Sequence, residues 1–195
     1  MRALSLTAIA ALLALPMVPA QAQSTRSIGF EGLDFGAIPV GYAGLSWSCN
    51  EGYNAWYATF IGNSYARPSS GTGNAFSDEG TALWFSMFGQ TFGLQSIFLS
   101  ELFRGVGDDI DVELDGLRNG VVVQTTSMQL DHNEMTKYDL NWTDIDRVSI
   151  FAVRGRLLID DITITATPEP STLALLATGL AGLGWFGWGR SRRRV

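Results

Sequence analysis

The sequence predicts an all-β protein, an antiparallel β-sandwich of jelly-roll type, flanked by a signal peptide and one C-terminal transmembrane helix. Short segments that alternate apolar and polar residues, or that are rich in β-branched residues, recur between glycine-rich connections. No stretch of a dozen residues in the middle of the chain keeps a helical period. Many short strands in series are typical of two packed antiparallel sheets.

The clearest pair of strands surrounds a two-residue turn. Ile110–Leu114 alternates apolar and acidic residues, which predicts a strand with one buried and one wet face. Asn119-Gly120 is a strong hairpin signal, and Val121–Thr125 is predicted to be the returning strand. Gly62–Gly80, rich in Ser, Gly, Asn and Pro, predicts a long surface loop. The other predicted strands are Ala82–Phe88, Gln95–Ser100, Lys137–Asn141, Arg147–Ala152 and Leu157–Thr165.

Residues 1–22 are predicted to be a signal peptide that signal peptidase removes. Arg2 precedes an apolar run over residues 3–15, and Ala20-Gln21-Ala22 places small residues at the two positions that the peptidase reads. The run is short for a membrane span, which favours cleavage over an uncleaved anchor. The predicted exported domain is residues 23–167.

The other end of the chain, residues 168–195, has three features in a fixed order. Pro168-Glu169-Pro170 is followed by an apolar segment over residues 171–189 and by a basic tail, 190–195, with four arginines. About twenty apolar residues can cross a hydrocarbon core as a helix, and the arginines would stay in the cytoplasm, with the domain outside. Together the three features resemble the PEP-CTERM sorting signal.

This resemblance implies an address and a partner. Proteins with such a tail are exported by Gram-negative bacteria that make exopolysaccharide, and an exosortase, an integral-membrane cysteine protease, is thought to cut near Pro168, Glu169 and Pro170. The chain is then a substrate that is transiently anchored in the inner membrane. After processing it is expected in the cell envelope, on the cell surface or in the extracellular matrix.

The charge of the exported domain excludes one class of partner. Residues 23–167 contain eight basic and eighteen acidic residues, so the domain carries 8 − 18 = −10. Nucleic-acid binding needs a basic surface, and we expect none. Cys49 is the single cysteine, so no internal disulfide can form, and it is predicted to be a small buried residue.

The middle of the chain also resembles the jelly-roll ectodomains of other exported PEP-CTERM proteins. The likeness is carried by Phe30-Glu31-Gly32-Leu33, by residues 38–47, by residues 141–148 and by residues 158–164. Such domains look like carbohydrate-binding modules, in which the first and last strands often pair and nearby carboxylates can hold a structural calcium ion. The likeness carries over to Glu31 and Asp161, and Asp160 adds a third carboxylate. The alternative is that Glu31 faces water and Asp160 ends a turn. No cofactor is otherwise expected.

Aromatic residues suggest a saccharide site. Tyr53, Trp56 and Tyr57 lie close together in the sequence among polar residues, and flat side chains stack well on sugar rings. One or two rings of this region can instead fill the core, and for Trp47 we expect the core.

Catalytic motifs are lacking, and the protein is predicted not to be an enzyme. The sole histidine, His132, has no partner motif around it and is expected at the surface. We predict a non-catalytic polysaccharide-binding module associated with exopolysaccharide or biofilm. Two alternatives remain: a structural matrix or surface protein without a discrete ligand, and an enzyme acting on glycans through paired carboxylates.

Overall fold

A computed structural model describes residues 24–49, 56–60, 62, 67–77, 82–102, 110–130, 134–152 and 155–166. The predicted signal peptide and sorting tail lie outside these residues. Residues Gln23–Thr167 form one compact unit. Within the described part of the chain, no helix is long and apolar enough to cross a membrane.

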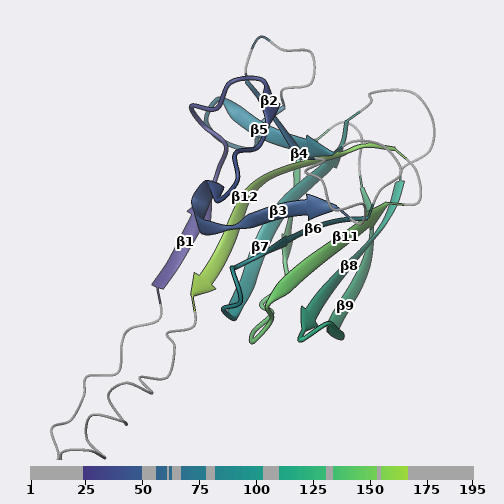
Figure 1. Cartoon of the computed structure of the whole chain (residues 1–195). Coiled ribbons are helices and arrows are strands. Elements are labelled where there is room, and N and C mark those ends of the chain that lie inside the picture. The colour runs from purple at the N-terminus through teal and green to yellow at the C-terminus, as the bar shows by residue number, and fades with distance from the viewer. Residues whose placement is uncertain are drawn as a thin grey trace, which may run out of the picture. The chain divides into compact units, whose positions relative to one another are not determined.

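Two antiparallel sheets form the domain, which confirms the predicted sandwich (Figure 1). Sheet A has the strand order β10 (Thr136–Asp139), β7 (Phe92–Glu101), β12 (Leu157–Ala166), β5 (Gly73–Ser77), β4 (Trp56–Phe60) and β2 (Gly36–Ala37). β1 (Ser24–Ile28) also pairs with β12, so the first and last strands lie side by side. Sheet B has the order β3 (Ser46–Cys49), β6 (Leu83–Ser86), β11 (Arg147–Ala152), β8 (Ile110–Arg118) and β9 (Val121–Leu130). A short 3-10 helix, η1 (Tyr42–Gly44), precedes β3.

The core lies between the two sheets and follows the period of two along the strands. In β8, Ile110, Val112 and Leu114 are buried, whereas Asp111 and Glu113 are exposed, as their alternation predicted. Trp47 of β3 is also in the core, as expected for it. The inward rows of both sheets thus exclude water, and the outward rows carry the residues that can meet a ligand.

The hydrogen-bonded turn Asn119-Gly120 joins β8 to β9, as predicted, and a second turn of the same kind joins β6 to β7. Both central residues have positive φ in each case, 51° and 77° for Asn119-Gly120 and 33° and 80° for Phe88-Gly89. Gln90 donates its amide to the Met87 carbonyl at 2.6 Å to close the second turn. Two central residues with positive φ define a type I′ turn, in which Asn-Gly is favoured. Phe88 therefore stands in strained backbone where the other turn has asparagine.

Exchanging these two turn residues is expected to change stability in opposite directions. Phe88→Asn should raise the free energy of unfolding by about 1 kcal/mol, because the left-handed conformation costs a bulky residue roughly that much more than asparagine. Asn119→Phe, the matched control, should lower it by a similar amount. Urea unfolding of both variants measures the difference, and a Phe88→Asn domain less stable than the original would contradict the reason given.

One predicted loop contains a strand that the sequence did not reveal. Within Gly62–Gly80, β5 pairs with β4 on one side and with β12 on the other. Its polar residue Asn74 is fully buried. The backbone amide of Arg67 donates a hydrogen bond to the Asn74 side-chain oxygen at 3.1 Å, which offsets the cost of burying it. Gly73 is required there, because a Cβ atom would lie 2.5 Å from the Phe30 carbonyl oxygen. The residues that look like a loop are thus small and polar because this strand is closely covered.

Candidate functional site

Of the three aromatic residues expected to bind saccharide, the structure places one in the core and one on the outer side of sheet A. Tyr53 lies outside the described residues. Trp56 is fully buried, and its ring meets that of Trp47 edge-on at 5.9 Å in the core. This corrects the expectation for Trp56, because a ring with no exposed surface cannot stack on a sugar. Tyr57, the next residue of β4, points to the other side of sheet A, where it is half-buried and stacks on Phe76 at 5.5 Å.

A second aromatic surface lies on the outer face of sheet B. Trp84 of β6 and Phe151 of β11 alternate with core residues and point away from the core, and Phe151 is 45% exposed. The Arg147 guanidinium lies 4.5 Å from the centre of the Trp84 ring. This cation–π contact covers one face of the indole and orders the ring on the sheet.

Polar side chains lie in register with Trp84 across this face. Trp84 pairs with Ser48 of β3 and with Ser149 of β11, and Ser149 pairs with Asp115 of β8. Within the described residues, Asp115 Oδ1 is buried and has no hydrogen-bond partner. A buried acceptor without a donor is costly. We call Ser48, Trp84, Asp115, Ser149 and Phe151 the Trp84 platform.

The Trp84 platform was not predicted from the sequence. Its members come from four strands, and only the register of those strands brings them together. One signal was present: in Leu83-Trp84-Phe85-Ser86 the apolar residues at 83 and 85 fill the core row, which leaves Trp84 on the outer row. A large aromatic residue on the wet face of a strand is a reason to examine that face.

The predicted calcium carboxylates lie on the outer side of sheet A. Asp160 of β12 is fully buried beneath residues 67–72, and Asp160 Oδ2 accepts hydrogen bonds from the Ser69 amide at 2.8 Å and the Ser69 hydroxyl at 3.0 Å. Ser69 Oγ also lies 2.8 Å from Asp161 Oδ2, so one hydroxyl bridges two carboxylates. Burial raises the pKa of Asp160 to about 6, hydrogen bonds from the Asp161 and Ser69 amides oppose this rise, and the nearby Asp161 charge adds to it.

Glu31 lies near the same segment. A Cβ atom on Gly71 would be 2.2 Å from a Glu31 carboxylate oxygen, which places this carboxylate directly against the backbone of residues 67–72. Burial raises the pKa of Tyr42, and the charges of Glu31 and Asp160 raise it further, so both carboxylates act on one hydroxyl. The described residues contain no set of three His, Cys, Asp or Glu side chains arranged to hold one metal ion. The Ser69 hydroxyl thus joins Asp160 and Asp161 into one cluster, whereas Glu31 lies against Gly71 of the same segment.

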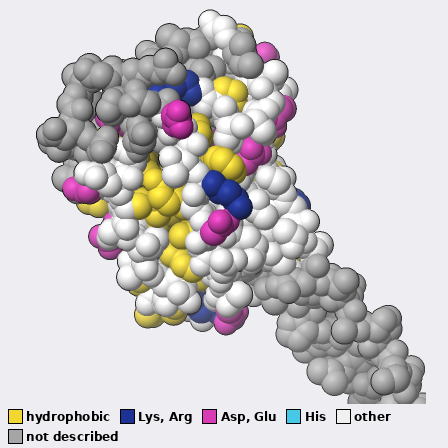
Figure 2. All heavy atoms as spheres, turned by 180° about the vertical axis from the view of Figure 1, so that it is seen from behind, with side chains coloured by type: hydrophobic (Ala, Val, Ile, Leu, Met, Phe, Trp, Pro, Cys, Tyr) yellow, Lys and Arg dark blue, Asp and Glu magenta, His cyan; other side chains and the backbone are white. Residues whose placement is uncertain are grey.

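The acidic run at residues 108–116 forms no ion-binding loop in its described part. Its residues from Ile110 onward belong to β8, with alternating burial, as the sequence indicated. Figure 2 shows one face of the domain, on which acidic side chains are spread around a central group of hydrophobic ones. His132 lies outside the described residues.

Comparison with known proteins identifies the tail. Residues 166–194 match the PEP-CTERM protein-sorting motif. No curated protein sequence matches the chain. The K1 cleaved adhesin domain of Lys-gingipain from Porphyromonas gingivalis W83 is similar in structure, with TM-score 0.48, 9% identity, and coverage of 74% of this chain and 99% of that one.

Two further similar structures are named for carbohydrate. The CBM22-1 xylan-binding domain of Paenibacillus barcinonensis Xyn10C has TM-score 0.45 and 12% identity, over 75% of this chain and 97% of that one. TmCBM61 in complex with β-1,4-galactotriose has TM-score 0.39 and 11% identity, over 66% of this chain and 95% of that one.

A PEP-CTERM motif indicates an exported protein and implies processing by an exosortase. The chain is thus an exported β-sandwich protein that carries a PEP-CTERM protein-sorting motif at its C-terminal end.

Proposed function

We propose that the domain is a non-catalytic module that binds a polysaccharide, and that the Trp84 platform is its binding face. The observation that carries this proposal is the ordered indole of Trp84, in register with Ser48 and Ser149 on either side and with Asp115 one strand further along the same face. A flat ring for the CH face of a sugar and acceptors for its hydroxyl groups are what a shallow saccharide site requires.

The charges around the platform favour a neutral polysaccharide. Asp111, Glu113 and Asp115 all lie on the outer row of β8, and the Arg147 guanidinium on the neighbouring strand is stacked on Trp84. A chain of uronates or sulfated sugars would be repelled by these carboxylates, whereas hydroxyl groups can donate to them. The exopolysaccharide that we propose as the partner is therefore rich in uncharged hexose or pentose units.

Trp84→Ala is expected to weaken retention of the protein on neutral polysaccharide by about tenfold, because the ring supplies most of the apolar contact. Affinity electrophoresis in gels containing a panel of soluble neutral and acidic glycans measures this change. Phe60→Ala, which removes another partly exposed aromatic side chain, is the matched control and should leave retention unchanged. Tyr57→Ala tests the surface that the sequence indicated.

The outcomes separate the proposed function from its alternatives. Loss of retention in Tyr57→Ala alone would move the saccharide site to sheet A. No retention of the original domain on any glycan would refute saccharide binding and favour a structural matrix protein without a discrete ligand. Release of shortened sugars during the assay would refute the non-catalytic role.

We also propose that one calcium ion stabilises the region around Asp160. Hard cations prefer oxygen ligands, and Asp160, Asp161 and the Ser69 hydroxyl already meet. A buried carboxylate beside a second carboxylate is unfavourable without a cation, which would offset both charges. Glu31 would add a third carboxylate by turning from Gly71 towards this pair. The ion would hold residues 67–72 on β12 and would take no part in saccharide chemistry.

The sorting tail defines the proposed route of the protein. Signal peptidase would cut after Ala22, and the apolar segment 171–189 would hold the exported domain at the inner membrane. Exosortase processing near Pro168-Glu169-Pro170 would then pass the domain to the cell envelope, the surface or the extracellular matrix. There a saccharide-binding face would retain it in exopolysaccharide or biofilm.

A further inference from the structure

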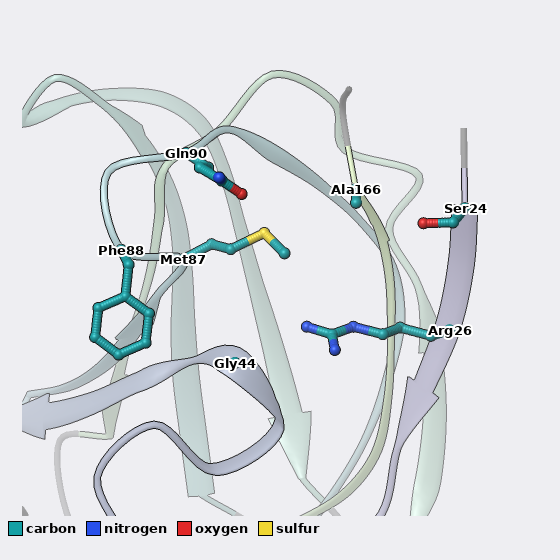
Figure 3. A pocket seen from close by; sticks show the side chains of 7 residues that line it. All are labelled: Ser24, Arg26, Gly44, Met87, Phe88, Gln90 and Ala166. Carbon is teal, nitrogen blue, oxygen red and sulfur yellow. The ribbon is translucent and has the colours of Figure 1, made fainter. Parts of the chain in front are cut away.

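A pocket of about 420 Å³ lies at the end of the sandwich where β1 begins and β12 ends. Ser24 and Ala166 line it on that side, and Met87 and Gln90 line it on the other. Figure 3 shows Arg26 reaching from β1 into the pocket towards Met87. Arg26 Nη2 donates to the Ala43 carbonyl at 2.7 Å, and the guanidinium has further N–H groups that can meet an anion.

Exposed hydrophobic side chains surround this pocket. Phe88 is 61% exposed, and its ring lies beside the backbone of Gly41, where a Cβ atom would be 4.0 Å from the ring. Val40, the neighbour of Gly41, is 92% exposed. Phe88 also occupies the strained position of its turn, at φ 33°. Strain of this kind persists where the side chain has a use that offsets it.

The Asn119-Gly120 turn brings more apolar residues to the same end. In sheet A, Ala166 lies opposite Phe92 at the start of β7, just after the Phe88 turn. In sheet B, Arg147 pairs with Ser86, just before the Phe88 turn, and with Leu117, just before the Asn119 turn. Both turns therefore lie at the end where β12 finishes (Figure 1). Beyond Asn119-Gly120, β9 begins with three exposed residues, Val121, Val122 and Val123. We call Arg26, Val40, Phe88 and Val121–Val123 the tail-end surface.

The connection between the domain and the predicted membrane segment is short, and this limits what the tail-end surface can contact. From Ala166 to Ser171, where the apolar segment begins, there are five Cα-to-Cα steps, which span at most about 17 Å. A domain tethered by so short a connection keeps the end that carries Ala166 close to the bilayer. This step rests on the proposed membrane-anchored stage.

We propose that the tail-end surface docks on the phospholipid bilayer while the protein is anchored. Arg26 would meet a lipid phosphate in the pocket, and Phe88 and Val40 would enter the interfacial layer, where apolar side chains beside a cation are favoured. A single base gives weak binding to an anionic surface by itself. The tether compensates, because it turns docking into an intramolecular step at a high effective concentration. Cleavage near residue 168 would remove the tether and thereby release the domain.

The test uses the full-length chain in phosphatidylglycerol-containing vesicles with a spin-labelled lipid quencher. In a Cys49→Ser background, Phe88→Cys and Glu134→Cys each carry one bimane label. Glu134 is exposed and precedes β10, whose start pairs with the far end of β7, so it reports on the opposite end. We expect lipid quenching at position 88 to exceed that at 134 by about threefold, and Arg26→Gln to reduce this excess.

Each other result overturns the docking. Equal quenching at both positions in a chain that floats with the vesicles would show a tethered domain that does not touch lipid. Quenching or protection at position 88 that appears only when exosortase is added would assign the tail-end surface to that protein. A chain that does not float with vesicles would refute the anchored stage itself, and the docking with it. Saccharide binding by the isolated protein would survive all three results.

Discussion

Trp56→Ala is expected to lower the free energy of unfolding by about 3–5 kcal/mol, the usual cost of removing a buried aromatic side chain. The indole is fully buried and packs against Trp47, which in turn contacts Phe30 at 5.7 Å and Phe85 at 5.5 Å. These rings connect β3, β4 and β6 across the core. Their surroundings cannot collapse onto the space left without moving strands of both sheets.

Chemical denaturation followed by near-ultraviolet circular dichroism measures this loss. Trp56→Phe should recover most of it, because a smaller ring still fills much of the space. Phe60→Ala, at the exposed end of the same strand, should cost far less. A Trp56→Ala domain that unfolds like the original but no longer binds polysaccharide would contradict the burial of Trp56 and restore its predicted role in binding.

The second large effect concerns the pH dependence of stability without calcium. Asp160 has its pKa raised from 3.8 to about 6 in the fold, chiefly by burial. A raised pKa means that the folded state binds the proton more tightly than the unfolded state does. The stabilisation is complete below pH 4 and is lost as the pH rises through 6, with a total of about 3 kcal/mol. In EDTA, the Asp160 contribution should therefore make the domain more stable at pH 5 than at pH 7.5.

Calcium should reverse this dependence, because it binds the charged carboxylates. At pH 7.5 calcium is expected to raise the unfolding temperature, and at pH 5 its effect should shrink as Asp160 gains a proton. Asp161→Asn separates calcium binding from backbone strain. The φ angle at this position is 42°, which asparagine tolerates well, so stability in EDTA should be retained. The increase in unfolding temperature caused by calcium should fall, because one carboxylate ligand is lost. If an Asp160→Asn domain keeps the pH profile of the original, the pH dependence does not come from Asp160. If the unfolding temperatures in calcium and in EDTA are equal, the domain binds no stabilising calcium ion.

The fold was predictable because its strongest signals are local. The alternation in Ile110–Leu114 and the turn at Asn119-Gly120 each determine a strand or a connection without help from distant residues. β5 was missed for the opposite reason. Its glycine and asparagine are unfavourable in strands on average, and only their burial between β4 and β12 explains them.

The proposed binding face was harder to predict than the fold. Tyr53, Trp56 and Tyr57 are close in sequence, but neighbouring residues of a strand point to opposite sides, so Trp56 and Tyr57 cannot belong to one surface. The Trp84 platform instead joins residues from β3, β6, β8 and β11. Sequence spacing contains no register, and a surface made by register becomes visible only in the folded domain.

The pairing of β1 with β12 determines when the sandwich can close. Thr25 and Thr165 lie 140 positions apart, yet their hydroxyl groups meet at 3.3 Å. Among the described strands β1 pairs with β12 alone, so the first strand has no partner until the last strand is in place. Contacts so distant in sequence form late and slowly. Closure of the sandwich therefore requires the residues just before the sorting motif, so the domain cannot complete its fold until nearly all of its chain is available.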